Sequence, residues 1–363
     1  MHRFSIKYVI WDNVKLLMSF GKIMLNQIRI SSRLRGRIIM EDQEILYWLI
    51  LRDLKIPDLK RIAELLKEKN VNLAEILEGS RKQLKNIGLD EKTMQHIVSA
   101  RKNLDKRKYY DILGELKKQG ISVIRYIDQE YPETLRRIRD PPLILFHKGS
   151  LKRFEQCIAI VGTRNASLFG RQMAREISRY LAEFFIIVSG LARGIDTEAH
   201  CGALEANQRN NGVTLAVLPW IYPVYPSENE ELLKDITKRG AAISENFEKP
   251  KNKRAKNAFV KRNRIISAIS SAIIVVETGE KGGTMHTVRY AKKYGKLIFV
   301  IKPPQEHFIE KRRSVGGFKV LKEKYGAIEV DCSDPKEAAD FIRKRVLRIV
   351  RRREKTLEDF ISE

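Results

Sequence analysis

Between residues 157 and 302 the chain alternates short apolar runs with longer amphipathic segments, and this alternation limits the possible folds more than any other feature. The apolar runs lack a strict polar and apolar alternation, which predicts strands that are buried on both faces. Buried strands that alternate with helices form βαβ units, and such units build a parallel sheet with helices on both faces. The predicted strands are residues 158–161, 185–188, 214–218, 241–243, 272–276 and 297–301.

The predicted helices lie between these strands, and the fold class is therefore α/β. An open parallel sheet binds its ligands beyond the carboxyl ends of its strands, near the point where the strand order reverses. The loops that directly follow the strands are where we expect a functional site. The predicted helices are residues 171–183, 196–206, 228–237, 261–269 and 284–294.

The remaining segments differ in pattern from this core domain, which we assign to residues 157–342. Residues 41–108 carry apolar side chains at helical spacing and predict a small helical domain, with a break at Gly79 and a capped turn from Gly88 to Asp90. Residues 109–156 form a connector that contains two strand-like runs, at 121–126 and 143–146, and residues 343–363 form a basic tail.

The first 39 residues form a basic extension without clear periodicity. They hold eight Lys and Arg residues and one acid, and a well-patterned segment begins only at Met40. No small-residue cleavage site follows their apolar patch, as it would in a secretory signal. We interpret these residues as an upstream extension or a mispredicted start.

The charge balance points to a polyanionic partner. The chain has 70 Lys and Arg residues against 45 Asp and Glu, a formal net charge of +25, which favours nucleic acid over other partners. Three widely separated cysteines form no metal-ligand pair and suit a reduced compartment, so we expect a cytoplasmic protein. No uncharged apolar run reaches the roughly 18 to 20 residues of a membrane helix, and we expect no membrane, metal or cofactor.

The loop after the first predicted strand consists of Gly162, Thr163 and Arg164. A glycine turn between a strand and a helix N-terminus offers free N–H groups and a helix dipole to an anion such as phosphate. The Arg164 guanidinium can hold a phosphate through two hydrogen bonds, which favours binding over a purely structural turn. The sequence matches neither GxGxxG nor a P-loop.

The loop after the second strand begins with Ser189 and Gly190, where the missing side chain lets a ligand approach the backbone. Asp196 and His200 stand four residues apart and could form a metal or acid/base pair. No third ligand or nucleophile stands near them in the sequence, so we expect Asp196 to cap the following helix instead.

The most basic segment, residues 249–264, contains eight cations and no acid. Its single aromatic residue, Phe259, stands among Lys256, Arg262 and Arg264. Cations that follow a backbone, combined with an aromatic ring on which a base can stack, match what single-stranded nucleic acid requires. The alternative for Phe259 is ordinary packing in the protein.

A fourth loop, residues 277–284, ends in Gly282, Gly283 and Thr284 before a predicted helix. Paired glycines suit a phosphate that rests on backbone N–H groups. Because loops after parallel strands meet at one edge of a sheet, we expect all four loops to converge on one site.

Five segments together resemble the DNA-processing protein A family, also called Smf or DprA, in order and spacing across residues 41–332. The resemblance implies a Rossmann-like, doubly wound, mostly parallel sheet after a small helical domain of sterile-alpha-motif type. It also implies binding of single-stranded DNA and loading of a RecA-type recombinase during transformation or recombination. The segments are VGTRNASLFG from residue 161, SGLARGIDTEAH from 189, YPSEN from 225, FVKRNRIISAIS from 259 and ETGEKGGTMHTVRYA from 277.

Carried over from the family, the DNA pocket consists of Arg164, Lys256, Phe259 and Arg262. In this interpretation the two arginines clasp phosphates, the lysine adds charge and Phe259 stacks on a base. The turns at residues 189–190 and 282–284 line the same pocket. We further expect a homodimer without catalytic residues.

Three other functions fit the sequence less well. A nucleotide phosphoribohydrolase similar to the LOG-type proteins carries PGGxGTxxE with a catalytic glutamate, but here Met285, His286 and Thr287 follow the glycines and Thr284. A dehydrogenase lacks support without GxGxxG. Membrane attachment through the two basic ends is the third alternative.

Overall fold

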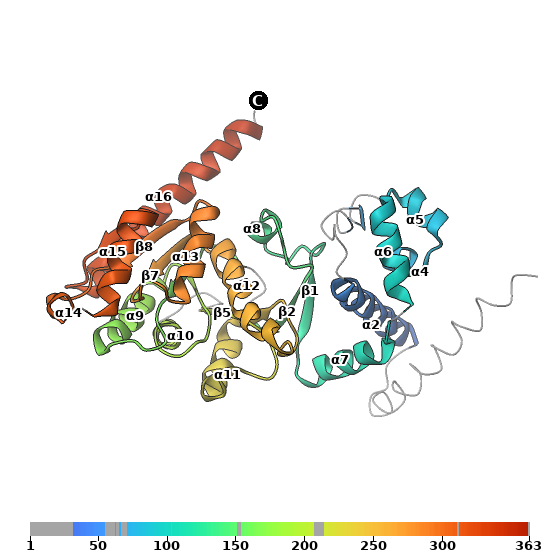
Figure 1. The fold of residues 1–363 in the computed structure, drawn as a ribbon, viewed down its shortest axis with the longest axis horizontal. Helices are drawn as coiled ribbons and strands as arrows, with labels where there is room; N and C mark the ends of the chain where they lie inside the picture. The colour runs from blue at the N-terminus through green and yellow to red at the C-terminus, as the bar shows by residue number, and fades with distance from the viewer. Residues whose placement is uncertain are drawn as a thin grey trace, which may run out of the picture. The chain divides into compact units, whose positions relative to one another are not determined.

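The computed structural model describes residues 32–54, 62, 65–66, 71–102, 104–150, 154–206, 214–310 and 312–361 (Figure 1). The chain divides into two compact units, Met1–Glu115 and Leu116–Glu363, and each is described by itself. Residues 1–31 of the basic extension lie outside the described part. None of the described helices combines the length and the apolar character that a membrane crossing requires.

The first unit is helical, as its spacing of apolar residues predicts. Trp48 and Ile76 are fully buried in its core. Gly88 adopts a left-handed conformation at the end of one helix, and the Asp90 carboxylate accepts a hydrogen bond from Thr93 N–H to cap the next, which confirms the predicted turn. Its helices are α2 (Ser32–Asp53), α4 (Leu73–Glu78), α5 (Arg81–Ile87) and α6 (Glu91–Arg101), and α7 (Lys106–Lys118) crosses into the second unit.

The second unit is built on one nine-stranded sheet in the order β1-β2-β6-β5-β4-β3-β7-β8-β9. The seven strands from β6 to β9 in this order are parallel, and β1 and β2 join one edge in antiparallel pairs. The predicted α/β fold with a mostly parallel sheet is confirmed. The strands are β1 (Ser122–Arg125), β2 (Ile144–Gly149), β3 (Cys157–Val161), β4 (Ile186–Ser189), β5 (Thr214–Leu218), β6 (Ala241–Ser244), β7 (Ala272–Val275), β8 (Leu297–Ile301) and β9 (Ile328–Val330).

Helices cover both faces of the sheet. On one face α9, α10 and α16 pack together over a core that includes Ile158 and Ile274, and on the other α12 packs against α13. The chain runs outward from β3 to β6 and then returns to β7 on the other side of β3, so the strand order reverses at β3. The helices are α8 (Glu133–Arg136), α9 (Leu168–Leu181), α10 (Ile195–Glu205), α11 (Glu230–Arg239), α12 (Lys253–Ile269), α13 (Thr284–Lys293), α14 (Gln305–Ile309), α15 (Arg313–Tyr325) and α16 (Pro335–Ile361), with a 3-10 turn η1 (Ser227–Asn229).

Helix α2 begins at Ser32, inside the predicted extension, and two further segments differ from the sequence-based expectation. Helix α12 begins at Lys253, eight residues before the predicted start, so most of the basic segment is itself helical. The basic residues after 342 continue α16, which extends from the sheet toward the C-terminus (Figure 1). The basic residues of both segments therefore follow each other at helical spacing, along α12 and α16.

Candidate functional site

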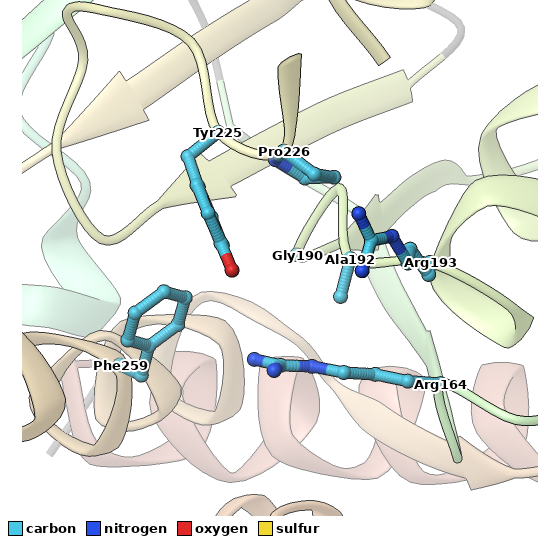
Figure 2. Close-up of a pocket in the computed structure, with 7 residues that line it drawn as sticks. All are labelled: Arg164, Gly190, Ala192, Arg193, Tyr225, Pro226 and Phe259. Atoms are coloured by element: carbon cyan, nitrogen blue, oxygen red, sulfur yellow. The ribbon is translucent and has the colours of Figure 1, made fainter. Parts of the chain in front are cut away.

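An open pocket lies beyond the carboxyl ends of β3, β4 and β5 (Figure 2). Its walls come from the loops after these three strands and from α12, which follows β6. The sheet topology predicts a binding site in this place. The lining residues are Arg164, Gly190, Ala192, Arg193, Tyr225, Pro226 and Phe259.

Two aromatic rings, Tyr225 and Phe259, form one wall of the pocket, and a third ring, Trp220, packs behind them. The Phe259 ring lies 5.3 Å from the Trp220 ring and 5.6 Å from the Tyr225 ring, in both cases near edge-to-face. Trp220 is 3% exposed and donates its indole N–H to Pro223 O, whereas Tyr225 is 43% exposed. A buried tryptophan thus supports two rings that face the open pocket.

Arg164 projects from the β3 loop toward this wall. Its guanidinium carbon lies 5.3 Å from the centre of the Phe259 ring, a cation–π distance. Within the described residues no carboxylate pairs with Arg164, and its side chain is exposed. Arg164 and Phe259, which the sequence predicted separately, are therefore brought together.

The other predicted cations lie in different environments. Lys256 is exposed one helical turn before Phe259, but it does not line the pocket. Arg264 is 3% exposed and forms ion pairs with Asp140 at 3.0 Å and Glu245 at 2.8 Å. These two ion pairs join α12 to the connector and to the loop after β6. The positive charge of Arg264 is therefore already balanced by carboxylates of the protein.

Arg262 lies beneath the pocket rather than in it. It is 7% exposed and donates from Nη1 to Val217 O at 2.6 Å. Its guanidinium lies directly against Gly190, where any side chain would overlap it. Burial lowers the pKa of Arg262 to about 10, against the opposing effect of the Asp196 carboxylate.

Asp196 and His200 belong to the same buried layer. Asp196 does not cap α10, whose N-cap is Gly194; its carboxylate instead accepts a long hydrogen bond from Ala192 N–H at 3.4 Å. Burial raises the pKa of Asp196, while the nearby Arg262 lowers it. Burial also lowers the pKa of His200 to about 3, and its Nδ1 contacts Thr214 Oγ1 at 2.7 Å. In the described part of the chain no cluster of three potential metal ligands occurs.

The remaining predicted residues hold the loops rather than line the pocket. Ser189 is buried and donates to Ile160 O at 2.7 Å. Thr284 donates to Gly162 O at 2.9 Å, and Thr163 N–H donates to Glu277 O at 2.7 Å. Gly282 and Gly283 precede α13 and are likewise absent from the lining. The loop after β7 therefore packs on the β3 loop at the same edge of the sheet, while its residues do not line this pocket.

The N-terminus of α9 holds an anion from the chain itself. A Glu277 carboxylate oxygen accepts a hydrogen bond from Ser167 N–H at 2.9 Å, and the Ser167 hydroxyl accepts one from Gly170 N–H at 3.0 Å. These N–H groups are therefore not free for an external phosphate, contrary to the expectation from the glycine turn. A mononucleotide whose phosphate bound at the N-terminus of α9, where the strand order reverses, would have to displace Glu277.

Sequence reasoning missed three features of the pocket. Tyr225 and Trp220 lie far from Phe259 in sequence, and only the β5 loop brings them to it. Arg193 lines the pocket and pairs with Glu228, with Nη2 and Oε2 at 2.7 Å. Because Arg193 stands shortly after a predicted strand, the sequence could have indicated a cation in this loop. Its acidic partner comes from another loop, and nothing in the sequence indicates that pairing.

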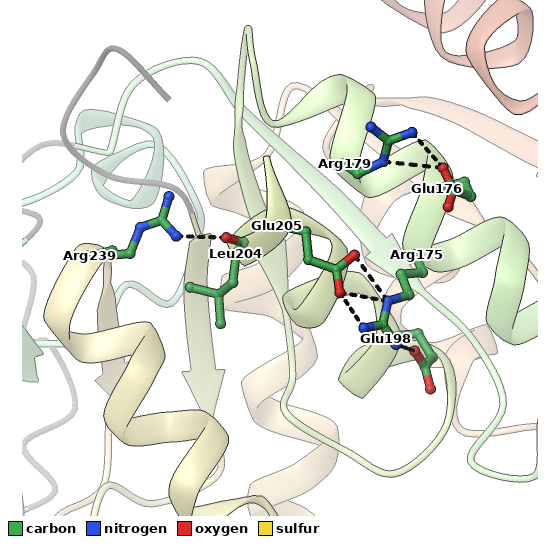
Figure 3. Close-up of polar contacts among 7 residues, drawn as sticks. All are labelled: Arg175, Glu176, Arg179, Glu198, Leu204, Glu205 and Arg239. Atoms are coloured by element: carbon green, nitrogen blue, oxygen red, sulfur yellow. Dashed lines mark hydrogen bonds and ion pairs between the residues drawn. The ribbon is translucent and has the colours of Figure 1, made fainter. Parts of the chain in front are cut away.

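Several arginines elsewhere on the unit are paired with acids or backbone oxygens. On α9, Arg175 pairs with Glu198 and Glu205, and Arg179 pairs with Glu176 at 2.8 Å (Figure 3). Arg239 donates to Leu204 O at 2.6 Å. Unlike these arginines, Arg164 lies against an aromatic ring without an acidic partner in the described structure.

A family model and two similar proteins point to the same family. A family model described as DNA recombination-mediator protein A matches residues 122–337. DNA processing protein DprA from Bacillus subtilis is 35% identical over 193 residues, which is 52% of this chain and 63% of that protein. Protein Smf from a Synechocystis species is 34% identical over 219 residues, 58% of this chain and 53% of that protein. The chain thus spans between about half and just under two thirds of the length of these relatives.

Two solved structures are similar in fold. DNA processing protein A from Streptococcus pneumoniae aligns with a TM-score of 0.57 and 26% identity, over 76% of this chain and 96% of that one. DNA processing protein A from Helicobacter pylori, whose structure addresses its single-stranded DNA binding mode, aligns with a TM-score of 0.52 and 27% identity, over 62% of this chain and 96% of that one.

Proposed function

Because the chain belongs to the DNA recombination-mediator protein A family, we propose that its pocket binds single-stranded DNA and that the protein passes this DNA to a RecA-type recombinase. The observation that carries the proposal is the contact between Arg164 and Phe259 in the open pocket. A cation beside a partly exposed aromatic ring suits a nucleotide, which is both charged and planar.

Each part of a nucleotide has a matching group in the pocket. An unpaired base can stack on Phe259 or Tyr225, since base stacking on aromatic rings tolerates every sequence. The neighbouring phosphate can pair with Arg164, and Lys256 is close enough along α12 to meet the next phosphates. Bases of a duplex are stacked and paired, so the same pocket disfavours double-stranded DNA.

We propose that this site binds and does not catalyse. Glu277 is committed to the N-terminus of α9, and no acid follows the glycines of the loop after β7 in the manner of the phosphoribohydrolases. Among the described residues, no histidine and no carboxylate, the usual general bases, lines the pocket beside Arg164 and Phe259.

The test is fluorescence anisotropy of labelled single-stranded and duplex oligonucleotides over a salt series. We expect Phe259→Ala to weaken single-strand binding by about 1 to 3 kcal/mol, the usual worth of one stacked base. Arg164→Ala should also weaken binding and reduce the slope of log K against log salt by about 0.7.

Phe184→Ala is the matched control, because Phe184 is 42% exposed and has an arginine 4.2 Å from its ring, yet lies just beyond α9 and away from the pocket. This variant should bind DNA like the wild type. Equal losses in the two phenylalanine variants would exclude the pocket as the binding site.

Delivery to a recombinase is a separate part of the proposal. A RecA-type protein should form filaments faster on DNA coated with a single-strand-binding protein when this protein is added. The Phe259→Ala variant should lose this acceleration. We also propose that the protein acts as a homodimer, which light scattering of the purified full-length chain measures.

A further inference from the structure

Arg193 and Glu228 form an ion pair at the rim of the pocket, and the family comparison assigns neither a role. Arg193 comes from the loop after β4, whereas Glu228 lies in η1 after the β5 loop. Both Nε and Nη2 of Arg193 donate to the Glu228 carboxylate, so the pair is bidentate. Figure 2 shows Arg193 on the same side of the pocket as Pro226, across from Phe259.

The fold holds Glu228 in this position. Its neighbour Asn229 is 7% exposed and donates from Nδ2 to Leu191 O and to Thr197 Oγ1, at 2.9 Å each. These two hydrogen bonds fasten η1 to the loop that carries Arg193 and to the first turn of α10. The ion pair is thus placed by a buried amide rather than by chance contact of two long side chains.

The Glu228 carboxylate accepts hydrogen bonds from the same N–H groups with which Arg193 would bind a phosphate. A guanidinium presents one edge, Nε and Nη2, that matches carboxylate and phosphate oxygens equally well. When a phosphodiester enters the pocket, the Glu228 carboxylate already occupies this edge of the Arg193 guanidinium. The negative charge of Glu228 also repels the phosphate. The carboxylate and the DNA backbone therefore compete for one cation.

We propose that Arg193 is a second phosphate-binding residue of the pocket and that Glu228 is its built-in competitor, which a DNA phosphate displaces. This inference rests on the proposed binding of single-stranded DNA at the pocket. The pair is exposed, with side-chain exposures of 62% and 47%, so separating it costs little and the exchange is readily reversible. Glu228 thereby lowers the affinity for DNA and speeds its release.

The experiment compares single-strand affinities of four proteins: wild type, Glu228→Gln, Arg193→Gln and the double variant. Glu228→Gln removes the competing charge and should bind more tightly by up to about fivefold, which is the upper end of the range for an exposed ion pair. Arg193→Gln should bind more weakly. In the double variant the gain from Glu228→Gln should largely disappear, since Glu228 acts through Arg193.

Glu176→Gln is the matched control for charge, because it frees Arg179 in the last turn of α9, away from the pocket. It changes the net charge by the same amount and should leave the affinity nearly unchanged. An equal gain in Glu176→Gln and Glu228→Gln would overturn the inference in favour of a general charge effect.

Weaker binding by Glu228→Gln would also overturn it, because Glu228 would then orient Arg193 rather than compete for it. The underlying function is tested separately by Phe259→Ala. If Phe259→Ala loses affinity while the Glu228 and Arg193 variants bind like the wild type, the pocket stands and only the competition fails.

Discussion

At the scale of single residues, an arginine beneath the pocket packs directly on a glycine that lines it. Gly190 has no side chain, so the Arg262 guanidinium can lie against its backbone and reach Val217 O. The positive charge of Arg262 also offsets the buried carboxylate of Asp196. Arg262 therefore supports the loop that lines the pocket, whereas the family resemblance implied that it clasps a phosphate.

Arg262→Ala is expected to destabilise the protein before any DNA is added. The substitution leaves Asp196 buried without its neighbouring cation, which should lower the free energy of unfolding by about 3 kcal/mol or more. Urea unfolding of the free protein measures this loss, with the exposed Arg164→Ala as a control that should unfold like the wild type. An Arg262→Ala protein of normal stability that fails to bind DNA would instead support a direct phosphate contact.

His200 gives a prediction about pH. Burial lowers its pKa to about 3 in the folded protein, whereas an unperturbed histidine has a pKa near 6.5. Between these values the unfolded chain takes up a proton that the folded protein does not. The free energy of unfolding should therefore fall as the pH drops below about 6.5, by about 1.4 kcal/mol per pH unit from this residue.

The measurement is the unfolding free energy of wild type and His200→Gln at several pH values between about 7.5 and 4.5. The variant cannot take up this proton in either state, so its stability should depend less steeply on pH. Parallel curves for the two proteins would show that His200 is not the group responsible.

The sequence could not reveal that Arg262 and Arg264 are buried. A run of cations normally forms a solvated face, and from charge alone all eight cations of residues 249–264 look alike. Their environments differ because α12 lies between the sheet and other segments of the unit, with Ile265 and Ile266 buried beside them. Two arginines on the enclosed part of the helix find backbone or carboxylate oxygens in segments distant in sequence.

At the scale of elements, the strands were the most predictable feature. Six of the seven parallel strands, β3 to β8, lie within two residues of the predicted ends because burial on both faces demands continuous apolar runs. The N-terminus of α9 was less predictable, since Glu277 reaches it from the loop after β7, more than a hundred residues later. A glycine turn before a helix looks the same whether its anion is a ligand or the chain's own carboxylate.

Glu277→Ala is expected to weaken the start of α9. The substitution removes a carboxylate from a helix N-terminus and leaves Ser167 N–H without its partner, which should cost about 1 kcal/mol. Thermal unfolding gives the loss, and amide hydrogen exchange should accelerate in the first turn of α9. Glu183→Ala, an exposed acid just after the same helix, serves as the control and should change neither.

At the scale of the whole molecule, the excess of positive charge is spread over several surfaces. The net charge of +25 includes exposed cations on α12 and others on α16, such as Lys344, Arg345 and Arg348. Cations outside the pocket attract any phosphate backbone, whether single or double stranded. In the function that we propose, the pocket supplies the distinction between the two forms, and the surrounding charge supplies general affinity.

Replacing Lys344, Arg345 and Arg348 by alanine should therefore weaken binding to single-stranded and duplex DNA by similar factors. The slope of log K against log salt should become shallower by about 0.7 for each single-strand phosphate that is no longer neutralised by a cation. Phe259→Ala, in contrast, should reduce only single-strand binding. A triple variant with a selective single-strand defect would mean that α16 takes part in recognition of unpaired bases.

The wall of the pocket formed by the β5 loop is fastened at both ends. Trp220 is bonded to Pro223 O, the backbone N–H groups of Ile221 and Tyr222 are bonded to Phe247 O, and Asn229 secures the far end of the loop. A wall held in this way is preorganised, so little of the binding energy is spent on ordering it. Capture of a strand should then proceed at the rate of charge-steered collisions, without waiting for a lid to close.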